Sequence, residues 1–466
     1  MDFSVIAQAP EVRAIVQDGL LERAFHDGLV PRFLYRGEVT PAEFPGQVGD
    51  SMNFTGVGLM KKRQRPVPPG QDPTPSSYGK EQWRAQLQQY GDSVDTDMLT
   101  SMVAIANLFL RDGHQIGIGA GQSLNGVARD ALYNAAESGH TVADTGPQSG
   151  TTLRVKRLNG FTRARRPDLT GASPVQFSTV SGSNPLKVTI FDNAVATANT
   201  VIGFTADTSG DEVGPGTLTL GTAATSVADR AYVYAYDATS WVLVGGGNKV
   251  DDVGSNDLFK LGDVRTAVAR FWQVNVPEHE DGTFHVHLDP TSMTQIFADD
   301  EFERLLTAMP DHYTYREFGL GQLLGCTFFR NSEAPILMTV GAGDGVFTLD
   351  DPFAGEMTNN GNATTGVPLH RVLFTGQECC HEYYSDLSAL LTEAGVVGKI
   401  AEPQITNNGI EVMTERTRLI LRAPLDRFQQ KVSTTWQFVG DFPVRTDAAT
   451  GDAARYKREL IVVHGQ

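Results

Sequence analysis

Two histidines, His285 and His287, lie two residues apart in the segment HVHLD, which ends at Asp289. Residues i and i+2 of a strand point to the same side, so both imidazoles could bind one metal ion, as in zinc hydrolases. No third and fourth ligand follow at a suggestive spacing, and short motifs of this kind match easily by chance. We favour a strand with two structural histidines and a helix-capping aspartate, and we expect no bound metal. A metal-dependent hydrolase is the less favoured alternative.

A second group combines a nucleophile, a base and a carboxylate in consecutive positions: Cys379, Cys380, His381 and Glu382. Adjacent residues of an extended chain point in opposite directions, so Cys380 and His381 would not form a catalytic pair. Two buried thiols are the better interpretation. With Cys326 the chain has three cysteines, too few for a disulfide framework, which favours a reducing compartment.

The glycine-rich residues 117–122 precede an apolar helical pattern, as phosphate-binding loops do. They lack the Lys-Ser/Thr pair of a P-loop, and Gln122 occupies the third glycine position of the dinucleotide-binding fingerprint. We interpret them as a flexible joint between two helices, one over residues 96–111 and one from Ser123 to Gly139. The sequence therefore predicts no catalytic residue and no cofactor.

Basic residues gather in residues 151–166 although the whole chain has a net charge of −17. A protein that coats nucleic acid would carry the opposite charge balance. We favour pairing of this cluster with carboxylates, within one subunit or between subunits, over contact with nucleic acid. The cluster comprises Arg154, Lys156, Arg157, Arg163, Arg165 and Arg166.

A smaller basic cluster lies at the start of the proline-rich residues 61–79, which hold five prolines and almost no apolar residue. Such a segment cannot pack a core of its own, so we expect an extended loop. An acidic surface of a neighbouring subunit is its natural docking site. Lys61, Lys62, Arg63 and Arg65 are the candidate inter-subunit contacts.

These candidate residues belong to a chain of 466 residues. That length is too great for one hydrophobic core and predicts two to four domains. No apolar run approaches ~18 residues, so no membrane helix is expected. Residues 1–30 carry a helical pattern but lack the basic and then apolar order of a secretory signal.

Residues 167–247 differ from their surroundings, with two basic and seven acidic residues and a richness in Thr, Val, Ser and Gly. Six short β-type runs recur there, separated by turn signals. This pattern predicts a small β-barrel or sandwich inserted into a host domain.

The chain beyond residue 247 is mixed. An apolar face predicts a helix around residues 264–271, and strands are expected over 283–288, 325–330 and 371–375. Asp289-Pro290 has the form of a helix start. A helix near 385–394 precedes a return to β structure in RLILRA, STTWQFV and ELIVVH.

The order of these parts resembles the major capsid proteins of tailed double-stranded-DNA bacteriophages, which share the Hong Kong 97-type fold. Residues 261–306 are similar in their pattern of helix, Asp-Gly turn, strand ending in a His/Asp-Pro step, and helix. Residues 319–335 resemble the segment in which these capsid proteins place a glycine-punctuated apolar run before a strand. SNPLKVTIFDNA (183–194) resembles a β insertion of some of these capsids.

The resemblance implies an α+β fold in which an N-terminal arm and an extended loop reach over neighbouring subunits and a spine helix crosses a peripheral domain. An axial domain would meet its copies at the capsomer axis. The expected parts are an N-terminal helix and arm (1–50), extended loop (51–95), spine helix and peripheral domain (96–166), inserted β domain (167–247), axial domain with peripheral connections (248–410) and C-terminal return to the peripheral domain (411–466).

The function that the resemblance implies is structural and not enzymatic. Copies of the chain would form hexamers and pentamers of an icosahedral head, enclosing packaged DNA without specific binding. The expected location is the virion capsid, assembled in the host cytoplasm, with scaffolding, portal and decoration proteins as further partners and no membrane. The alternative is another virion structural protein, a tail or decoration subunit.

Overall fold

The computed structural model describes most of the chain. The described residues are 20–30, 34–44, 51–57, 70, 72, 80–97, 108–165, 177–192, 195–209, 214–229, 231–235, 241–246, 253–308, 321–331, 333–335, 337–339, 367–385, 404–406, 409–414, 416–422, 431–445 and 457–465. They divide into two compact units. Unit 1 comprises Met1–Asn53, Arg84–Ala131 and Cys380–Pro443, and unit 2 comprises Phe54–Trp83, Leu132–Cys379 and Val444–Gln466.

Unit 1 contains a sheet in the order β1-β19-β23-β22-β21-β20, with β4 paired to β23. In β23 every second residue is buried, which is the alternation expected of a sheet with one face on the core. The bounds are β1 Thr40–Glu43, β4 Gln88–Asp97, β19 His381–Tyr384, β20 Gln404–Thr406, β21 Gly409–Thr414, β22 Thr417–Arg422 and β23 Lys431–Asp441, with a short 3-10 turn η2 at Arg36–Glu38.

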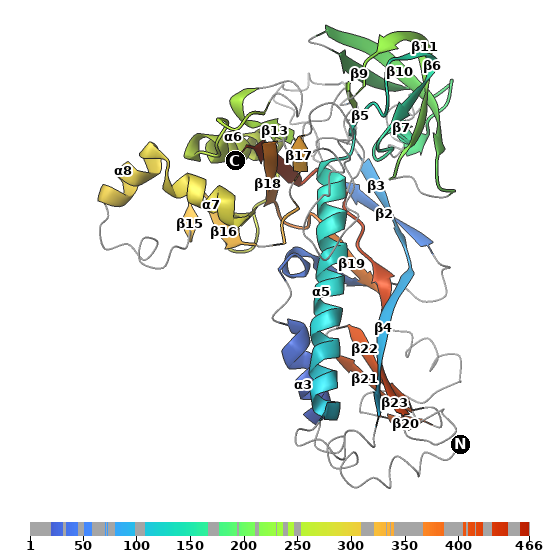
Figure 1. Cartoon of the computed structure of the whole chain (residues 1–466), viewed down its shortest axis with the longest axis vertical. Coiled ribbons are helices and arrows are strands. Elements are labelled where there is room, and N and C mark those ends of the chain that lie inside the picture. Colours follow the sequence, from blue (N-terminus) through green and yellow to red (C-terminus); the bar gives the residue numbers. More distant parts are fainter. Residues whose placement is uncertain are drawn as a thin grey trace. The chain divides into compact units, whose positions relative to one another are not determined.

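The long helix α5, Leu108–Ala136, is continuous through the glycine-rich residues, so the predicted joint between two helices is wrong. Figure 1 shows it as one rod with α3, Leu20–Leu29, beside its N-terminal half. Gly117 serves packing instead, because a Cβ there would come within 2.3 Å of the Phe25 carbonyl. Gly28 of α3 has the matching role, since a Cβ there would come within 2.5 Å of the His114 carbonyl. Residues 98–107 of the first predicted helix lie outside the described residues.

Strands β2, Ser51–Val57, and β3, Lys80–Gln86, form a separate two-stranded sheet. Phe54 and Trp83 stack across it, with ring centroids 6.3 Å apart. The proline-rich residues 61–79 connect the two strands, and apart from Gly70 and Asp72 they lie outside the described residues.

Unit 2 contains a six-stranded antiparallel sheet in the order β5-β12-β9-β10-β11-β6. A bridge between Ala143 and Val155, with hydrogen bonds from Asp144 N to Arg154 O and from Lys156 N to Val142 O, joins β5 to β6 and closes the sheet into a barrel. The strands are β5 His140–Val142, β6 Gln148–Val155, β9 Leu186–Asp192, β10 Val195–Ala206, β11 Gly216–Val227 and β12 Tyr232–Ala235, with a small β7–β8 pair at Arg163–Arg165 and Phe177–Thr179.

The barrel differs in its bounds from the insertion predicted for residues 167–247. Two of its six strands, β5 and β6, precede residue 167, and β6 contributes Leu153 and Val155 to the apolar interior. At the other end, β13, Trp241–Leu243, pairs with β24, Glu459–His464, in a different sheet. The composition shift located four strands but missed β6, because that strand carries Arg154 and leads into the basic residues 156 and 157.

The second sheet of unit 2 has the order β13-β24-β18-β14-β16-β15, with β17 paired to β18. Strand β24 lies between β13 and β18 and is buried at all six residues, which explains its nearly unbroken apolar sequence. The remaining bounds are β14 Phe284–Leu288, β15 Gln322–Leu323, β16 Cys326–Arg330, β17 Leu337–Thr339, β18 Val367–Thr375, α6 Leu261–Val274, α7 Pro290–Phe297, α8 Asp300–Ala308 and the 3-10 turn η3 Val244–Gly246.

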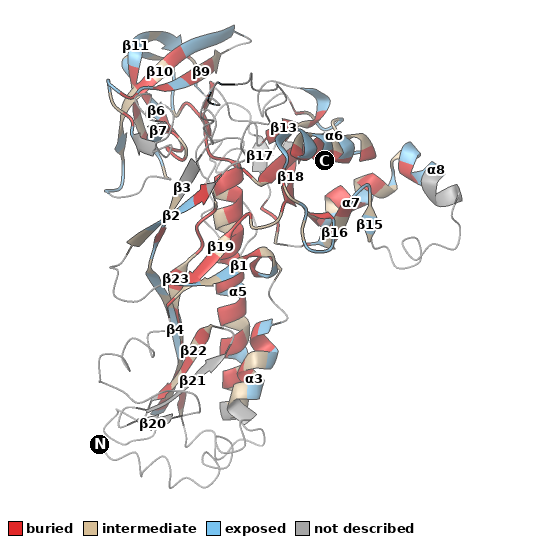
Figure 2. Ribbon diagram, turned by 180° about the vertical axis from the view of Figure 1, so that it is seen from behind, coloured by how far each residue is buried: buried red, intermediate tan, exposed pale blue. Residues whose placement is uncertain are grey.

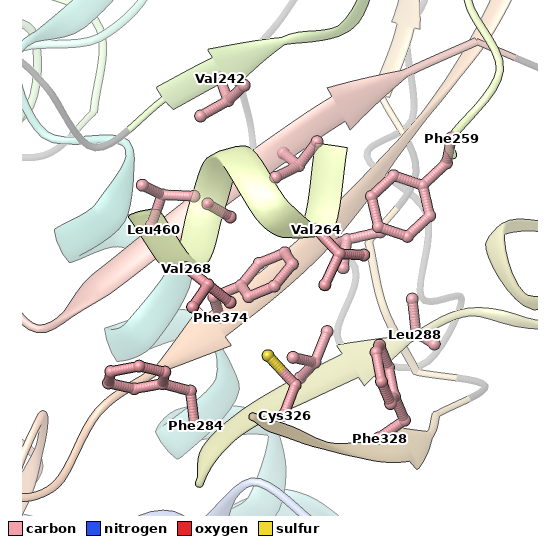
Figure 3. Close-up of a cluster of buried hydrophobic side chains, with 14 of the residues drawn as sticks. Val242, Phe259, Val264, Val268, Phe284, Leu288, Cys326, Phe328, Phe374 and Leu460 are labelled. Carbon is pink, nitrogen blue, oxygen red and sulfur yellow. The ribbon is translucent and has the colours of Figure 1, made fainter. Parts of the chain in front are cut away.

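The core of this sheet lies under α6, where Val264 and Val268 pack toward Phe374 and Leu460 (Figure 3). The predicted α+β class is confirmed, as are the helix over 264–271, the strands at 283–288, 325–330 and 371–375, and the three C-terminal strands. The expected single C-terminal region 411–466 is divided, because β21 to β23 belong to unit 1 and β24 to unit 2. The helix predicted near 385–394 lies outside the described residues, apart from Ser385.

Candidate functional site

The two histidines of the HVHLD segment lie on β14, as predicted, and both rings contact Phe329. His285 Nε2 lies 3.1 Å from Asp281 Oδ2, and its ring stacks on His279 with centroids 3.8 Å apart. His287 is buried. His287 therefore packs inside unit 2, whereas His285 lies between a carboxylate and a second imidazole.

Asp289 performs the predicted capping of α7. Its side chain accepts hydrogen bonds from the backbone amides of Thr291 and Ser292, and Pro290 is the first helical residue. An aspartate followed by proline was a sufficient local signal for this helix start.

All three cysteines are buried, which confirms the prediction for Cys379 and Cys380. The Cys380 thiol lies 3.6 Å from the Phe442 carbonyl, to which it can donate. Burial raises the pKa of Cys326 to about 12, so this thiol stays protonated. None of this resembles an activated nucleophile.

Arg154, Lys156 and Arg157 of the basic cluster pair with carboxylates of their own chain. Arg154 bridges Asp144 and Asp207, with contacts of 2.9 and 2.7 Å, and Lys156 Nζ lies 2.7 Å from Asp144. Burial alone would raise the pKa of Asp144, but hydrogen bonds from Lys156 and Arg154 lower it overall. The preferred interpretation of this cluster is confirmed for these residues. Arg166 lies outside the described residues, as do Lys61, Lys62, Arg63 and Arg65.

A buried ion-pair cluster lies directly after the C-terminal end of α5. Glu137 accepts from Arg157 Nη1 at 2.5 Å through one oxygen and from Arg371 Nη1 through the other. Arg371 also donates to the Pro335 carbonyl at 3.1 Å and lies over the Tyr133 ring. One carboxylate therefore joins the helix end to the segment after β6 and to β18.

The same helix end is capped by a buried cation. Lys457 Nζ donates to the Ala135 carbonyl at 3.0 Å and to Ser138 Oγ at 2.7 Å. A positive charge is stabilised there because the carbonyls at a helix C-terminus carry partial negative charge. No local sequence signal revealed this cluster, since its members come from four distant segments.

Unit 1 has its own buried ion pair, in which Arg36 contacts Glu382 and lies over the Phe438 ring. Arg416 approaches the second carboxylate oxygen at 3.3 Å. Asn125 of α5 accepts hydrogen bonds from three consecutive backbone amides, at residues 34 to 36. These contacts attach the segment after α3 to the long helix and the sheet.

Ser292, His464 and Asp289 form the one grouping among the described contacts that has the residue types of a hydrolase triad. Ser292 Oγ lies 2.6 Å from His464 Nε2, but Asp289 contacts Ser292 and His370, while His464 Nδ1 faces the Gly465 carbonyl at 2.8 Å. A hydroxyl has one proton, so Ser292 donates to Asp289 or to His464 and not to both. Ser292 and His464 are fully buried, which closes this serine to substrates.

Neither a protein-family model nor a curated protein matches the chain. Among solved structures it is similar to the capsid of cyanophage P-SCSP1u, with 9% identity, a TM-score of 0.47 and coverage of 92% of this chain and 87% of that one. The capsid of Ralstonia phage GP4 gives 11% identity, a TM-score of 0.47 and coverage of 92% and 87%. The capsid of Helicobacter pylori bacteriophage KHP30 gives 9% identity, a TM-score of 0.40 and coverage of 92% of this chain and 88% of that one.

None of the described helices combines the length and the hydropathy needed to cross a membrane.

Proposed function

We propose that this chain is a structural subunit of the icosahedral head of a tailed bacteriophage, which assembles into hexamers and pentamers around double-stranded DNA. The support is that this chain contains a ribbon whose two strands flank the proline-rich residues, one long helix, a six-stranded barrel and a mixed sheet, in the order that the sequence resemblance implies. In this proposal α5 is the spine helix, unit 1 the peripheral part, and the mixed sheet of unit 2 the axial part.

The β2–β3 ribbon is the observation that carries the lattice role. Among the described residues its strands pair with no other sheet, and the adjoining β4 is exposed at most of its positions (Figure 2). At one end it contacts side chains of its own chain, with Arg445 over the Trp83 ring and Gln86 N donating to Asp441. A two-stranded ribbon is at best marginally stable alone in water. Ordering its backbone costs ~1–2 kcal/mol per residue, which contacts with a partner would offset.

The proposal includes a location in the virion, assembly in the host cytoplasm, and contact with scaffolding, portal and decoration proteins. It assigns no reaction to the chain. Lys61, Lys62, Arg63 and Arg65 are its inter-subunit contacts, and DNA is enclosed without specific binding because the chain carries a charge of −17.

Sedimentation velocity of the purified full-length chain over a range of concentrations tests the proposal. We expect capsomer-sized and larger species that grow with concentration. A monomer that persists at every concentration and ionic strength, in the presence of crowding agents, would contradict it.

A further inference from the structure

Trp272 is an unusual surface residue. It lies on the outer face of α6 and is 57% exposed, while the three other tryptophans are buried or half-buried. Val274, at the end of the same helix, is 37% exposed. Tryptophan is highly buried on average and is enriched among the residues that dominate binding interfaces. This end of α6 therefore has the character of a docking surface.

Acidic residues border the exposed indole. Trp272 Nε1 donates to Glu278 Oε1 at 3.3 Å, which brings the ring and a carboxylate onto one surface. Glu280 and Asp281 follow in the same loop, and both are exposed. The loop contains no lysine or arginine. On α6 itself, Arg270 donates to the Trp241 carbonyl at 2.9 Å and Arg265 is paired with Glu301 at 2.8 Å. Asp281 is bound by His285, so the surface combines an aromatic ring with the two exposed carboxylates of Glu278 and Glu280.

An aromatic face beside carboxylates is suited to a proline-containing basic peptide. Proline rings pack on aromatic side chains with little loss of entropy, and the carboxylates attract lysine and arginine. Residues 61–75, KKRQRPVPPGQDPTP, offer four basic residues followed by five prolines. Their charge is opposite to that of the surface beside Trp272.

We propose that Trp272, Val274, Glu278 and Glu280 form a docking surface for residues 61–75 of a second copy of this chain. This inference rests on the proposed lattice function and identifies the acceptor of the extended loop. A second copy is the occupant for an electrostatic reason. A chain with a net charge of −17 repels its own copies over most of its surface, but this contact pairs its densest basic segment with an acidic surface.

Charge reversal in the full-length chain tests the pairing. One variant carries Glu278→Lys and Glu280→Lys, and the other carries Arg63→Glu and Arg65→Glu. Each alone should raise the concentration needed for assembly, measured by light scattering, about tenfold, which corresponds to ~1.4 kcal/mol per contact. The control for the first variant is Asp27→Lys with Asp300→Lys, the same charge change at two exposed acidic residues elsewhere, which should have no such effect.

Mixing the two reversed variants distinguishes contact between copies from contact within one copy. In an equimolar mixture each loop finds a surface of opposite charge only on the other variant, so assembly should return to within about threefold of the wild type. If the mixture stays defective while a single chain with all four reversals assembles, the contact lies within one copy and the proposal is overturned. Reversals that behave like the control would also overturn it.

A peptide with the sequence of residues 59–77 provides a test that does not depend on assembly. Added to full-length protein below its assembly concentration, it should shift tryptophan emission to shorter wavelength, and high salt should weaken the effect. Trp272→Phe should remove the shift, while the same substitution at buried Trp436 should retain it. Absence of binding to wild-type protein would overturn this inference and leave the proposed function intact, whereas peptide binding without any shell would refute the proposed function alone.

Discussion

Gly117 of α5 lies directly against the backbone carbonyl of Phe25 in α3, and a Cβ at this position would come within 2.3 Å of that oxygen. Gly119, two residues later in the same helix, would meet nothing within 4 Å. The two glycines therefore differ in role although they share one helix and one motif.

We predict that Gly117→Ala lowers the free energy of unfolding of the chain by ~1–3 kcal/mol, because the helices must separate to admit the methyl group. Gly119→Ala should raise it by up to ~1 kcal/mol, since alanine favours the helix over glycine. Chemical denaturation measured by circular dichroism compares them. Equal effects of the two substitutions would show that α3 does not pack at Gly117.

The glycine-rich residues show why the sequence predicted the positions of helices better than it predicted whether two neighbouring helices are continuous. Three glycines in five residues predict a break, because glycine disfavours helices. The close approach of α3 is a tertiary contact that no window of the sequence contains, and it makes Gly117 a requirement of the packing. The start of α7, by contrast, depends only on Asp289 and its next three residues, and it was predicted correctly.

The carboxylate of Glu137 should be essential to unit 2. Glu137→Gln replaces it with an amide while Arg157 and Arg371 remain buried around it, so we expect a loss of ~3–5 kcal/mol in the free energy of unfolding. The exposed Glu280→Gln serves as the control and should change stability by less than ~0.5 kcal/mol. A loss at Glu137 no larger than the control would mean that the arginines are solvated in solution.

The barrel should fold as a fragment only when its first two strands are included. A fragment of residues 138–236 contains all six strands, and we predict a cooperative thermal transition and a β-type circular dichroism spectrum. A fragment of residues 167–247 lacks β5 and β6 and should remain unfolded, because the edges of β11 and β12 stay unpaired. If the shorter fragment melted cooperatively and the longer one did not, the insertion bounds expected from composition would be the better description.

Acid should destabilise unit 2 through its buried histidines. Burial first, and then the charge of Lys457, lowers the pKa of His140 to about 3, and burial lowers the pKa of His464 to about 4. Because the pKa of each histidine is lower in the folded chain, the unfolded chain binds the proton more readily. The stability that the neutral, buried histidines contribute is therefore complete above pH ~6.5 and is lost as the pH falls.

Substitution of one histidine isolates its share of the pH dependence. His140→Phe retains a ring to stack on Trp241 and removes the titration, so the loss of stability between pH 6.5 and 3 should be smaller by a few kcal/mol. Denaturation midpoints over this range measure it. Parallel pH profiles of the variant and the wild type would exclude His140 as the source.

The buried networks were not predictable from the sequence. Glu137 and Arg371 are 234 positions apart, and each alone looks like an ordinary surface residue. The barrel was recognised through its composition, because four strands lie in a segment that is poor in lysine and arginine and rich in β-branched residues. The strand β6 precedes that segment and was obscured by Arg154 and the basic residues that follow it. Hydrophobic periodicity predicts local conformation. It contains no signal for ion pairs between segments that are far apart in the sequence.

Electron microscopy of the assembled full-length chain tests the central claim most directly. The account predicts closed shells whose surface resolves into six-fold and five-fold rings, with one barrel projecting per subunit. Tubes or fibres would instead identify a tail-type structural protein. A product with no rings, formed by protein that binds and turns over a substrate, would contradict a structural role altogether.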